Sequence, residues 1–239
     1  MIDKVYLQWN NYQKLDKEEQ LVYQYCCQNN IPVDYYSYKL ISRRQINVTK
    51  NTLVVGDIRC FYQALKQLNI PIPTIDDYPE VLQFALNRKI VKKLAKHITY
   101  FPVFIKPAKR LKLFTGFVAN DKFDLNYYVY VPNNELCYVS DVIEFTSEYR
   151  VFINQQKIVG IKPAPQSEDH INLLNLSIIE KSVELLGNNK AGYAIDFGLT
   201  KDNQTTLIEV NDGFSIGSYG LDYINYFNIL LSRWEQLVN

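Results

Sequence analysis

Three side chains in the C-terminal part of the chain have oxygen atoms that could bind a metal ion. Asp196 lies in YAIDFGL, Glu209 and Asn211 lie in TTLIEVN, and the polar turn Thr200–Gln204 between them predicts a β-hairpin. Residues two apart in a strand share a face, so Glu209 and Asn211 point the same way. If Asp196 faces that side too, two carboxylates and an amide oxygen converge, which suits Mg²⁺. The alternative is a turn-capping Asp196 and a solvated Glu209, although the apolar neighbours make an unbound charge costly.

Two lysines end apolar strand segments. Lys106 ends the run Val103–Ile105 in PVFIKP, Lys162 ends KIVGIKP, and the proline after each one breaks strand pairing. Lysines in such positions could contact nucleotide phosphates as compact charges, or they could extend to water from ordinary strand ends. The basic segment AKRLKLFTG, residues 108–116, is either a flap over phosphates or a solvated turn.

Several catalytic classes are excluded by missing motifs. The sequence contains neither GxxxxGK[ST] nor GxGxxG, so a P-loop and a dinucleotide-binding turn are excluded. The four cysteines show no CxxC spacing and form no zinc cluster with histidine. His97 and His170 lie far from any serine elbow, which argues against a hydrolytic triad. Nucleophilic catalysis by a protein side chain therefore has little support in the sequence.

Composition and charge predict an ordinary globular protein. Lys and Arg number 26 against 25 Asp and Glu, so the net charge of +1 gives no field that would select nucleic acid. No signal-peptide core and no 18-residue apolar stretch is present. We therefore expect a cytoplasmic protein with reduced thiols, no membrane association and no nucleic-acid partner. Five of the nine glycines fall within residues 192–220, beside the candidate metal ligands.

The first 70 residues predict a small parallel α/β unit. Strand patterns at residues 4–9, 33–40 and 52–56 alternate with helical patterns at 13–28 and 60–68. The prolines of NIPIP end the second helix.

The remaining segments predict an antiparallel sheet between helices. Glu80–His97 has helical spacing and is expected to form the longest helix. From Pro102 to Lys162 the apolar residues alternate with the period of β-strands. The strand segments are PVFIKP, FTGFVA, NYYVYV, ELCYVSDVIEF, EYRVFI and KIVGIK, with a turn at Asn154–Gln156 between the last two. A helix at Asn172–Leu186, the hairpin and a helix at Ile224–Val238 follow. The predicted class is α+β with an α/β head.

Together these segments resemble the ATP-grasp superfamily over about residues 80–225. The resemblance is carried by IDFGL, TLIEVNDG and VFIKP. NDGFSIGSYGLD, with Lys162 where many members have arginine, is similar to a clade of small bacterial and phage proteins named for two arginines and a lysine. The resemblance implies a pre-grasp-like α/β unit at residues 1–76 and an ATP-grasp domain at 77–239. Its central subdomain, about 77–140, and C-terminal subdomain, about 141–239, would sandwich ATP.

The resemblance also implies roles for individual residues. The metal ligands would be Asp196, Glu209 and Asn211, binding Mg²⁺, with Mn²⁺ as an alternative, beside the ATP phosphates. Arg150 and Lys162 would be catalytic and face phosphate or acyl substrate. The residues expected to bind the nucleotide are Lys89, Lys106 and Lys162 at the phosphates, Asp141, Val142 and Ile143 at adenine, and Glu148 at ribose. The basic segment replaces a Gly/Ser-rich flap, and Ala194 stands where an arginine is often found.

The loop after the hairpin is expected to contact the acyl or amine substrate. The glycines of this loop allow its backbone to approach the active site closely and to adopt positive φ angles. The alternative is a flexible loop before the last helix. The residues expected to contact substrate are Asp212, Gly213, Ser215, Ser218 and Tyr219.

The function implied by the resemblance is that of an ATP- and Mg²⁺-dependent carboxylate–amine ligase, which forms an acyl-phosphate and transfers the acyl group to an amine. Its substrate would be a peptide, an amino acid or a protein, and a homodimer is compatible with the family. Positioning and charge neutralisation supply most of such catalysis, so the lack of a protein nucleophile is consistent with it. A nucleotide-binding module without ligase chemistry and a phosphotransferase are the alternatives.

Overall fold

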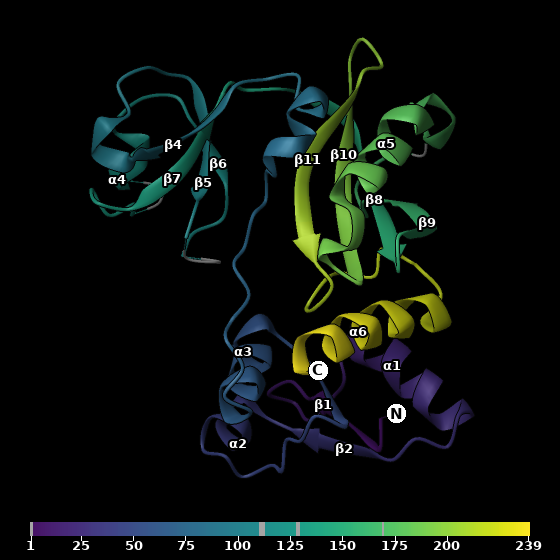
Figure 1. The fold of residues 1–239 in the computed structure, drawn as a ribbon. Coiled ribbons are helices and arrows are strands. Elements are labelled where there is room, and N and C mark those ends of the chain that lie inside the picture. The colour runs from purple at the N-terminus through teal and green to yellow at the C-terminus, as the bar shows by residue number, and fades with distance from the viewer. Residues whose placement is uncertain (1, 110–112, 128–129, 169) are drawn as a thin grey trace.

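The computed structural model describes residues 2–109, 113–127, 130–168 and 170–239, and it contains three β-sheets that follow one another along the chain (Figure 1). The N-terminal sheet has the order β2-β1-β3, and all of its strands are parallel. Its elements are β1 (Lys4–Gln8), α1 (Lys17–Gln28), β2 (Val33–Tyr36), α2 (Tyr38–Ser42), β3 (Thr52–Val55) and α3 (Ile58–Gln67). The predicted parallel α/β unit is confirmed, although the segment predicted as a strand over 33–40 becomes a helix after Tyr36.

The central sheet is antiparallel and has the order β4-β7-β5-β6. Its core consists of apolar strand residues packed with Phe114 and Leu125. Its elements are β4 (Ile90–Leu94), η2 (Ala95–His97), β5 (Val103–Pro107), β6 (Phe117–Ala119), α4 (Asp124–Tyr127) and β7 (Leu136–Ser140).

The long helix predicted over Glu80–His97 is wrong. A short 3-10 helix, η1 (Glu80–Ala85), ends before Asn87, which has a φ of 49°. The Asn87 side chain donates to Thr206 Oγ1, and Arg88 Nη1 donates to the Leu207 carbonyl at 2.8 Å. These contacts turn the chain onto the next sheet, and the remaining apolar residues pair with β7 as β4. The longest helix is instead at the C-terminus.

The predicted strand NYYVYV, residues 126–131, is also wrong where the structure describes it. The carboxylate of Asp121 accepts the backbone N–H groups of Phe123 and Asp124, and α4 begins at Asp124 and includes residues 126 and 127. Such side-chain capping favours a helix start. Tyr128 and Val129 lie outside the described residues.

The C-terminal sheet is antiparallel and has the order β11-β10-β8-β9. The helix α5 covers one face, where buried residues of β8 and β10 pack against Ile179 and Val183. Its elements are β8 (Phe145–Asn154), β9 (Lys157–Pro163), η3 (Ile171–Leu173), α5 (Leu176–Leu186), η4 (Gly187–Asn189), β10 (Gly192–Thr200), β11 (Thr205–Asp212) and α6 (Tyr223–Val238). The predicted α+β fold with an α/β head is therefore confirmed.

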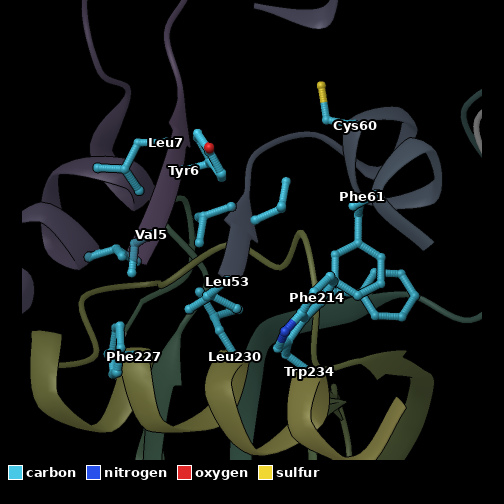
Figure 2. Close-up of a cluster of buried hydrophobic side chains, with 14 of the residues drawn as sticks. Val5, Tyr6, Leu7, Leu53, Cys60, Phe61, Phe214, Phe227, Leu230 and Trp234 are labelled. Atoms are coloured by element: carbon cyan, nitrogen blue, oxygen red, sulfur yellow. The ribbon is translucent and has the colours of Figure 1, made fainter. Parts of the chain in front are cut away.

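The C-terminal helix α6 lies between the C-terminal sheet and the N-terminal unit (Figure 1). Figure 2 shows Phe227, Leu230 and Trp234 of α6 in one buried cluster with residues of β1, β3 and α3. The Phe227 ring stacks on Tyr25 of α1 with centroids 3.9 Å apart. The last helix, α6, thus completes the core of the N-terminal unit. The expected domain division at residue 76 assigns α6 to the ATP-grasp domain instead. That division stays a prediction.

None of the helices within the described ranges is long and apolar enough to cross a membrane.

Replacing Phe227 by alanine should lower the free energy of unfolding by about 3–5 kcal/mol, because a fully buried aromatic ring is lost and a cavity remains. Urea unfolding of the whole chain measures this. Ile224→Ala, at a position 47% exposed on the same helix, is the matched control and should stay within about 0.5 kcal/mol of the wild type. Equal effects of the two substitutions would show that α6 is not part of the N-terminal core.

Candidate active site

Four charged residues form a row across one face of the C-terminal sheet. The strand register places Glu209 of β11 opposite Asp196 of β10, Asp196 opposite Arg150 of β8, and Arg150 opposite Lys162 of β9. Directly opposed residues in antiparallel strands share a face, so two acids and two cations lie side by side. We call these four residues the charged row.

A β-bulge makes this arrangement possible. Asp196 pairs with Glu209 and the next residue, Phe197, pairs with Leu207, so Ile208 is an extra residue in β11. Leu207 is fully buried on the face covered by α5, whereas Glu209 lies on the opposite face with Asp196. Without the bulge, residues two apart would share a face.

Arg150 and Asp196 form a buried bidentate ion pair at the centre of the row. Arg150 Nε donates to Asp196 Oδ1 at 2.8 Å and Nη2 donates to Oδ2 at 2.7 Å. Burial alone would lower the pKa of Arg150, but the hydrogen bonds and the charge of Asp196 raise it above its ordinary value. The guanidinium therefore stays charged at any physiological pH.

Lys106 connects the central sheet to the charged row. Its ammonium lies 2.5 Å from Glu209 Oε2 and 2.7 Å from Asp77 Oδ2, and it stands 5.5 Å from the centre of the Tyr78 ring. Burial opposes the charged form, yet Glu209, Tyr78 and Asp77 raise the pKa of Lys106. The predicted phosphate lysine thus carries a fixed positive charge beside the predicted metal ligands.

Sequence reasoning missed the residues around Lys106. The sequence pattern assigns no role to Asp77 or Tyr78, and it places Tyr138 only in a strand. In the structure, Tyr138 pairs with Lys106 in β5 and its ring meets Tyr78 edge to face at 4.8 Å. The available signal was the acidic pair Asp76 and Asp77 soon after the proline-rich NIPIP.

The loop after β11 closes over Arg150. The Gly217 carbonyl accepts from Arg150 Nη1 at 3.2 Å, and the Tyr219 ring lies 4.2 Å from the guanidinium carbon. Ser218 donates from its backbone N–H and its hydroxyl to Glu18 of α1. Ser215 has a φ of 53° and donates to the Gly56 carbonyl at 2.7 Å. Three of the predicted substrate residues therefore lie in the segment that joins the row to the N-terminal unit.

Two other predicted substrate residues, Asp212 and Gly213, contact the protein itself. Asp212 follows Asn211 in β11 and so lies on the opposite face, where its carboxylate accepts hydrogen bonds from Arg233 Nε at 2.5 Å and Nη2 at 2.8 Å. Gly213 packs so closely that a Cβ would lie 2.1 Å from the Gly192 carbonyl oxygen. The structure therefore does not bring Asp212 or Gly213 to the charged row; Asp212 anchors α6 instead.

The predicted adenine residues, Asp141 to Ile143, lie in the connection without regular structure between β7 and β8, not in a strand. Glu148, the predicted ribose acid, lies two residues from Arg150 on the same face of β8. Desolvation and the charges of Asp196 and Glu209 raise its pKa.

Of the other residues predicted to bind phosphate, one is exposed and several are not described. Lys89 is exposed in the connection before β4 rather than on a helix. In the basic segment 108–116, Arg110, Leu111 and Lys112 lie outside the described residues.

Asp196, Glu209 and Asn211 lie close enough to form an oxygen donor set. Asn211 Nδ2 donates to Asp196 Oδ2 at 2.9 Å, and Glu209 is the direct neighbour of Asp196. Residues 2–109, 113–127, 130–168 and 170–239 contain no group of three His, Cys, Asp or Glu side chains that could hold a metal. A cation here would need the Asn211 amide oxygen and oxygens of a ligand. An all-oxygen set of this kind fits Mg²⁺ or Mn²⁺, which take carboxylate and amide oxygens as ligands.

Nucleophilic catalysis by the buried thiols is disfavoured. Burial raises the pKa of Cys26 and Cys60 to about 12 and that of Cys137 to about 11. These groups stay protonated, and the thiolate is the reactive form.

Comparison with known proteins identifies the family. A family model matches residues 85–229 and describes an ATP-grasp domain, namely the second family of the clade named for two arginines and a lysine. No curated protein matches the chain.

Solved structures share the fold at low sequence identity. The D-alanine–D-alanine ligase of Bacillus anthracis complexed with ATP has a TM-score of 0.56 at 15% identity, and the match covers 98% of this chain and 96% of that one. The L-amino acid ligase of Bacillus licheniformis has a TM-score of 0.57 at 13% identity, with 96% and 73% covered. The macrocyclase MdnC of Microcystis aeruginosa, bound with its precursor peptide MdnA, has a TM-score of 0.55 at 14% identity, with 99% of both chains covered.

Replacing Asp196 by asparagine should lower the free energy of unfolding by about 3–5 kcal/mol, because Arg150 would be left buried without its counter-charge. Urea unfolding followed by circular dichroism measures this. The control is Glu144→Gln, which breaks an exposed ion pair with Lys201 and should leave stability unchanged within error. A loss no larger than that of the control would mean that the buried pair does not stabilise the sheet.

Proposed function

Because the chain belongs to the ATP-grasp domains, in the second family of the clade named for two arginines and a lysine, we propose that it is an ATP- and Mg²⁺-dependent carboxylate–amine ligase. The observation that carries the proposal is the charged row of the C-terminal sheet with Lys106 reaching it from the central sheet. ATP binding is supported by the ATP complex of the Bacillus anthracis ligase, which has the same fold. The substrate class, an amino acid or peptide, is supported by the L-amino acid ligase and by the macrocyclase bound with its precursor peptide.

The proposed reaction has two steps. A substrate carboxylate oxygen attacks the γ-phosphorus of ATP, and ADP leaves with the bond electrons. The amine nitrogen then attacks the carbonyl carbon of the acyl-phosphate, phosphate leaves, and the amine gives up a proton. Such transfers depend on positioning and on neutralisation of charge.

The residues of the site suit those requirements. Mg²⁺ held by Asp196, Glu209 and Asn211 would neutralise charge on the transferring phosphoryl group. Lys106 and Lys162 would bind phosphate oxygens as point charges. Three of the five N–H donors of Arg150 are used by Asp196 and Gly217, so two are left for an acyl or phosphate oxygen. Tyr219 and Asp196 hold the guanidinium in place for that contact.

One observation favours a nucleotide-binding module as the second candidate. Both acids of the row already have counter-ions, Arg150 for Asp196 and Lys106 for Glu209. A metal would have to compete with these pairs. A module that binds nucleotide without turnover would keep them.

Replacing Glu209 by glutamine should reduce ADP formation at least about 100-fold, because one metal ligand and one counter-charge of Lys106 are lost. Release of ADP is measured with pooled amino acids and peptides in the presence of Mg²⁺. Glu180→Gln, an exposed position on α5, changes the net charge equally and should behave as wild type. Equal release by the Glu209 variant and the wild type would refute the metal assignment. No release by the wild type with any pool, together with retained ATP binding, would favour the module.

Mass spectrometry of the product separates ligase from phosphotransferase. A ligase joins donor and acceptor with loss of one water from their summed mass. A phosphotransferase product retains the phosphoryl group.

A further inference from the structure

A cavity of about 380 Å³ lies between the N-terminal unit and the loop after β11. It is lined by the ends of β1 and β3, the first turn of α1, and residues 214–217, with Phe61 and two residues of α6 at its inner side. We call it the acidic cavity. None of the residues that form the charged row lines it.

The cavity lies at a place where parallel sheets commonly bind ligands. In the order β2-β1-β3 the chain passes from β1 to one side of it and then to the other, so the C-terminal ends of β1 and β3 form a topological switch point. Two hydrogen bonds join the end of β1 to the residues after β3. Gln8 Oε1 accepts from the backbone N–H of Asp57 at 2.6 Å, and Gln8 Nε2 donates to Asp57 Oδ2 at 3.0 Å. Gly56 permits this contact, since a Cβ there would lie 2.3 Å from Gln8 Oε1.

All charged side chains lining the cavity are acids. Three have protein partners: Asp16 accepts from Asn10 at 3.0 Å, Glu18 accepts from Ser218, and Asp57 caps α3. Glu19 is half-buried, and in the described part of the chain no other side chain is hydrogen-bonded to it or paired with it. Among the described residues, Glu19 is thus the acid of this lining to which no other side chain is bonded.

Part of the cavity lining is apolar. Phe61 and Phe214 stack with ring centroids 4.1 Å apart, and Figure 2 shows both in the cluster that also contains Leu53 and Leu230. Binding sites for small organic molecules commonly combine such a surface with a few placed polar groups. A small molecule with a positively charged end and an adjoining apolar group would suit both the Glu19 carboxyl group and the Phe61–Phe214 rings.

Gly217 connects the cavity to the charged row. It lines the cavity, and its carbonyl accepts from Arg150, which pairs with Asp196. The cavity therefore lies one residue away from the site proposed for acyl transfer.

We propose that the acidic cavity binds the protonated primary amino group of a substrate, with Glu19 as its counter-ion and the Phe61–Phe214 wall against an apolar side chain. This inference rests on the proposed ligase function. The ammonium group belongs either to the amine acceptor or to an amino acid that donates the acyl group; both present the same chemistry to Glu19.

The protonation of Glu19 is consistent with this role. Burial raises the pKa of Glu19 to about 7, and the charges of Asp16, Glu18 and Asp57 raise it as well. The other titratable groups that face it are Tyr36 of β2 and Tyr226 of α6, which burial keeps neutral. A bound ammonium would favour the ionised form of Glu19.

The test is a titration of the whole chain with L-leucinamide, which has an ammonium group and an apolar side chain but no carboxylate. The indole N–H signals of the two tryptophans are followed by ¹⁵N NMR, because Trp9 lines the cavity while Trp234 is buried in the core. We expect a saturable shift of the Trp9 signal, and a smaller one of Trp234, whose ring lies 5.6 Å from that of the wall residue Phe61. Glu19→Gln should weaken binding at least about tenfold, since a charge-assisted hydrogen bond is lost. The control variant Glu180→Gln should bind as wild type.

Matched probes make the result decisive. N-acetyl-L-leucinamide, which has no ammonium group, and glycinamide, which has no side chain, should both bind more weakly than L-leucinamide. Glu19→Asp keeps the charge and should retain part of the affinity, and the ¹⁵N spectrum of each variant verifies its fold. Equal affinity of wild type and Glu19→Gln, or of L-leucinamide and its acetylated form, would overturn the proposal.

The two sources of the amino group are separated in the reaction with ATP. If the cavity holds the acceptor, L-leucinamide appears in the product. If it holds the acyl donor, L-leucinamide competes with the carboxylate substrate and is recovered unchanged. The titration itself needs no ATP, so absence of ligase activity and absence of ammonium binding are distinct results.

Glu19 should also make stability depend on pH. Its folded-state pKa of about 7 lies above the ordinary value of 4.5, so the stability associated with its protonated form is lost as pH rises between these values. Glu19→Gln should therefore melt at a higher temperature than wild type at pH 8, and the difference should shrink at pH 5. Thermal unfolding at both pH values measures this. A difference that does not change with pH would contradict the burial of an ionisable Glu19.

Discussion

The ion pair between Arg150 and Asp196 joins two strands of the C-terminal sheet and holds the loop that leads from it to the N-terminal unit. Both charges are buried, so each depends on the other to offset the loss of water. Arg150 also donates to Gly217 and stacks on Tyr219, and it thereby fixes the loop that follows β11. That loop in turn bonds to Glu18 of α1. This pair, together with the core that α6 forms with the N-terminal unit, therefore sets the position of that unit relative to the charged row.

Lys106 performs the corresponding task between the central and C-terminal sheets. It contacts Glu209 across 103 residues of sequence and also contacts Asp77, so the carboxylates of two different segments share one cation. Asp77, Glu209 and Asp196 thus each have a cation of the protein beside them. On the proposed function, nucleotide phosphates and Mg²⁺ would enter by exchanging partners with these pairs, which keeps each charge compensated before and after binding.

Sequence reasoning succeeded where local pattern decides structure. The alternation of apolar residues and acids in YAIDFGL and TTLIEVN, with a polar turn between them, predicted the hairpin and the shared face of Glu209 and Asn211, because strand periodicity places side chains on faces. Sequence reasoning left the face of Asp196 open, and the strand register decides it. It failed over Glu80–His97, where apolar spacing suited a helix. Contacts of Asn87 and Arg88 with the distant strand β11 overrode that preference.

The sequence by itself determined the residue types, the hairpin, the parallel α/β head and the family resemblance, because these depend on short-range periodicity and on motifs read along the chain. Only the tertiary structure decided that Arg150 and Lys162 continue the row of Asp196 and Glu209, that a bulge at Ile208 turns Glu209 toward it, and that Asp212 turns away. It also decided that α6 completes the first core and that Glu19 faces a cavity. Strand register and packing between distant segments set these positions, and neither is encoded in local spacing.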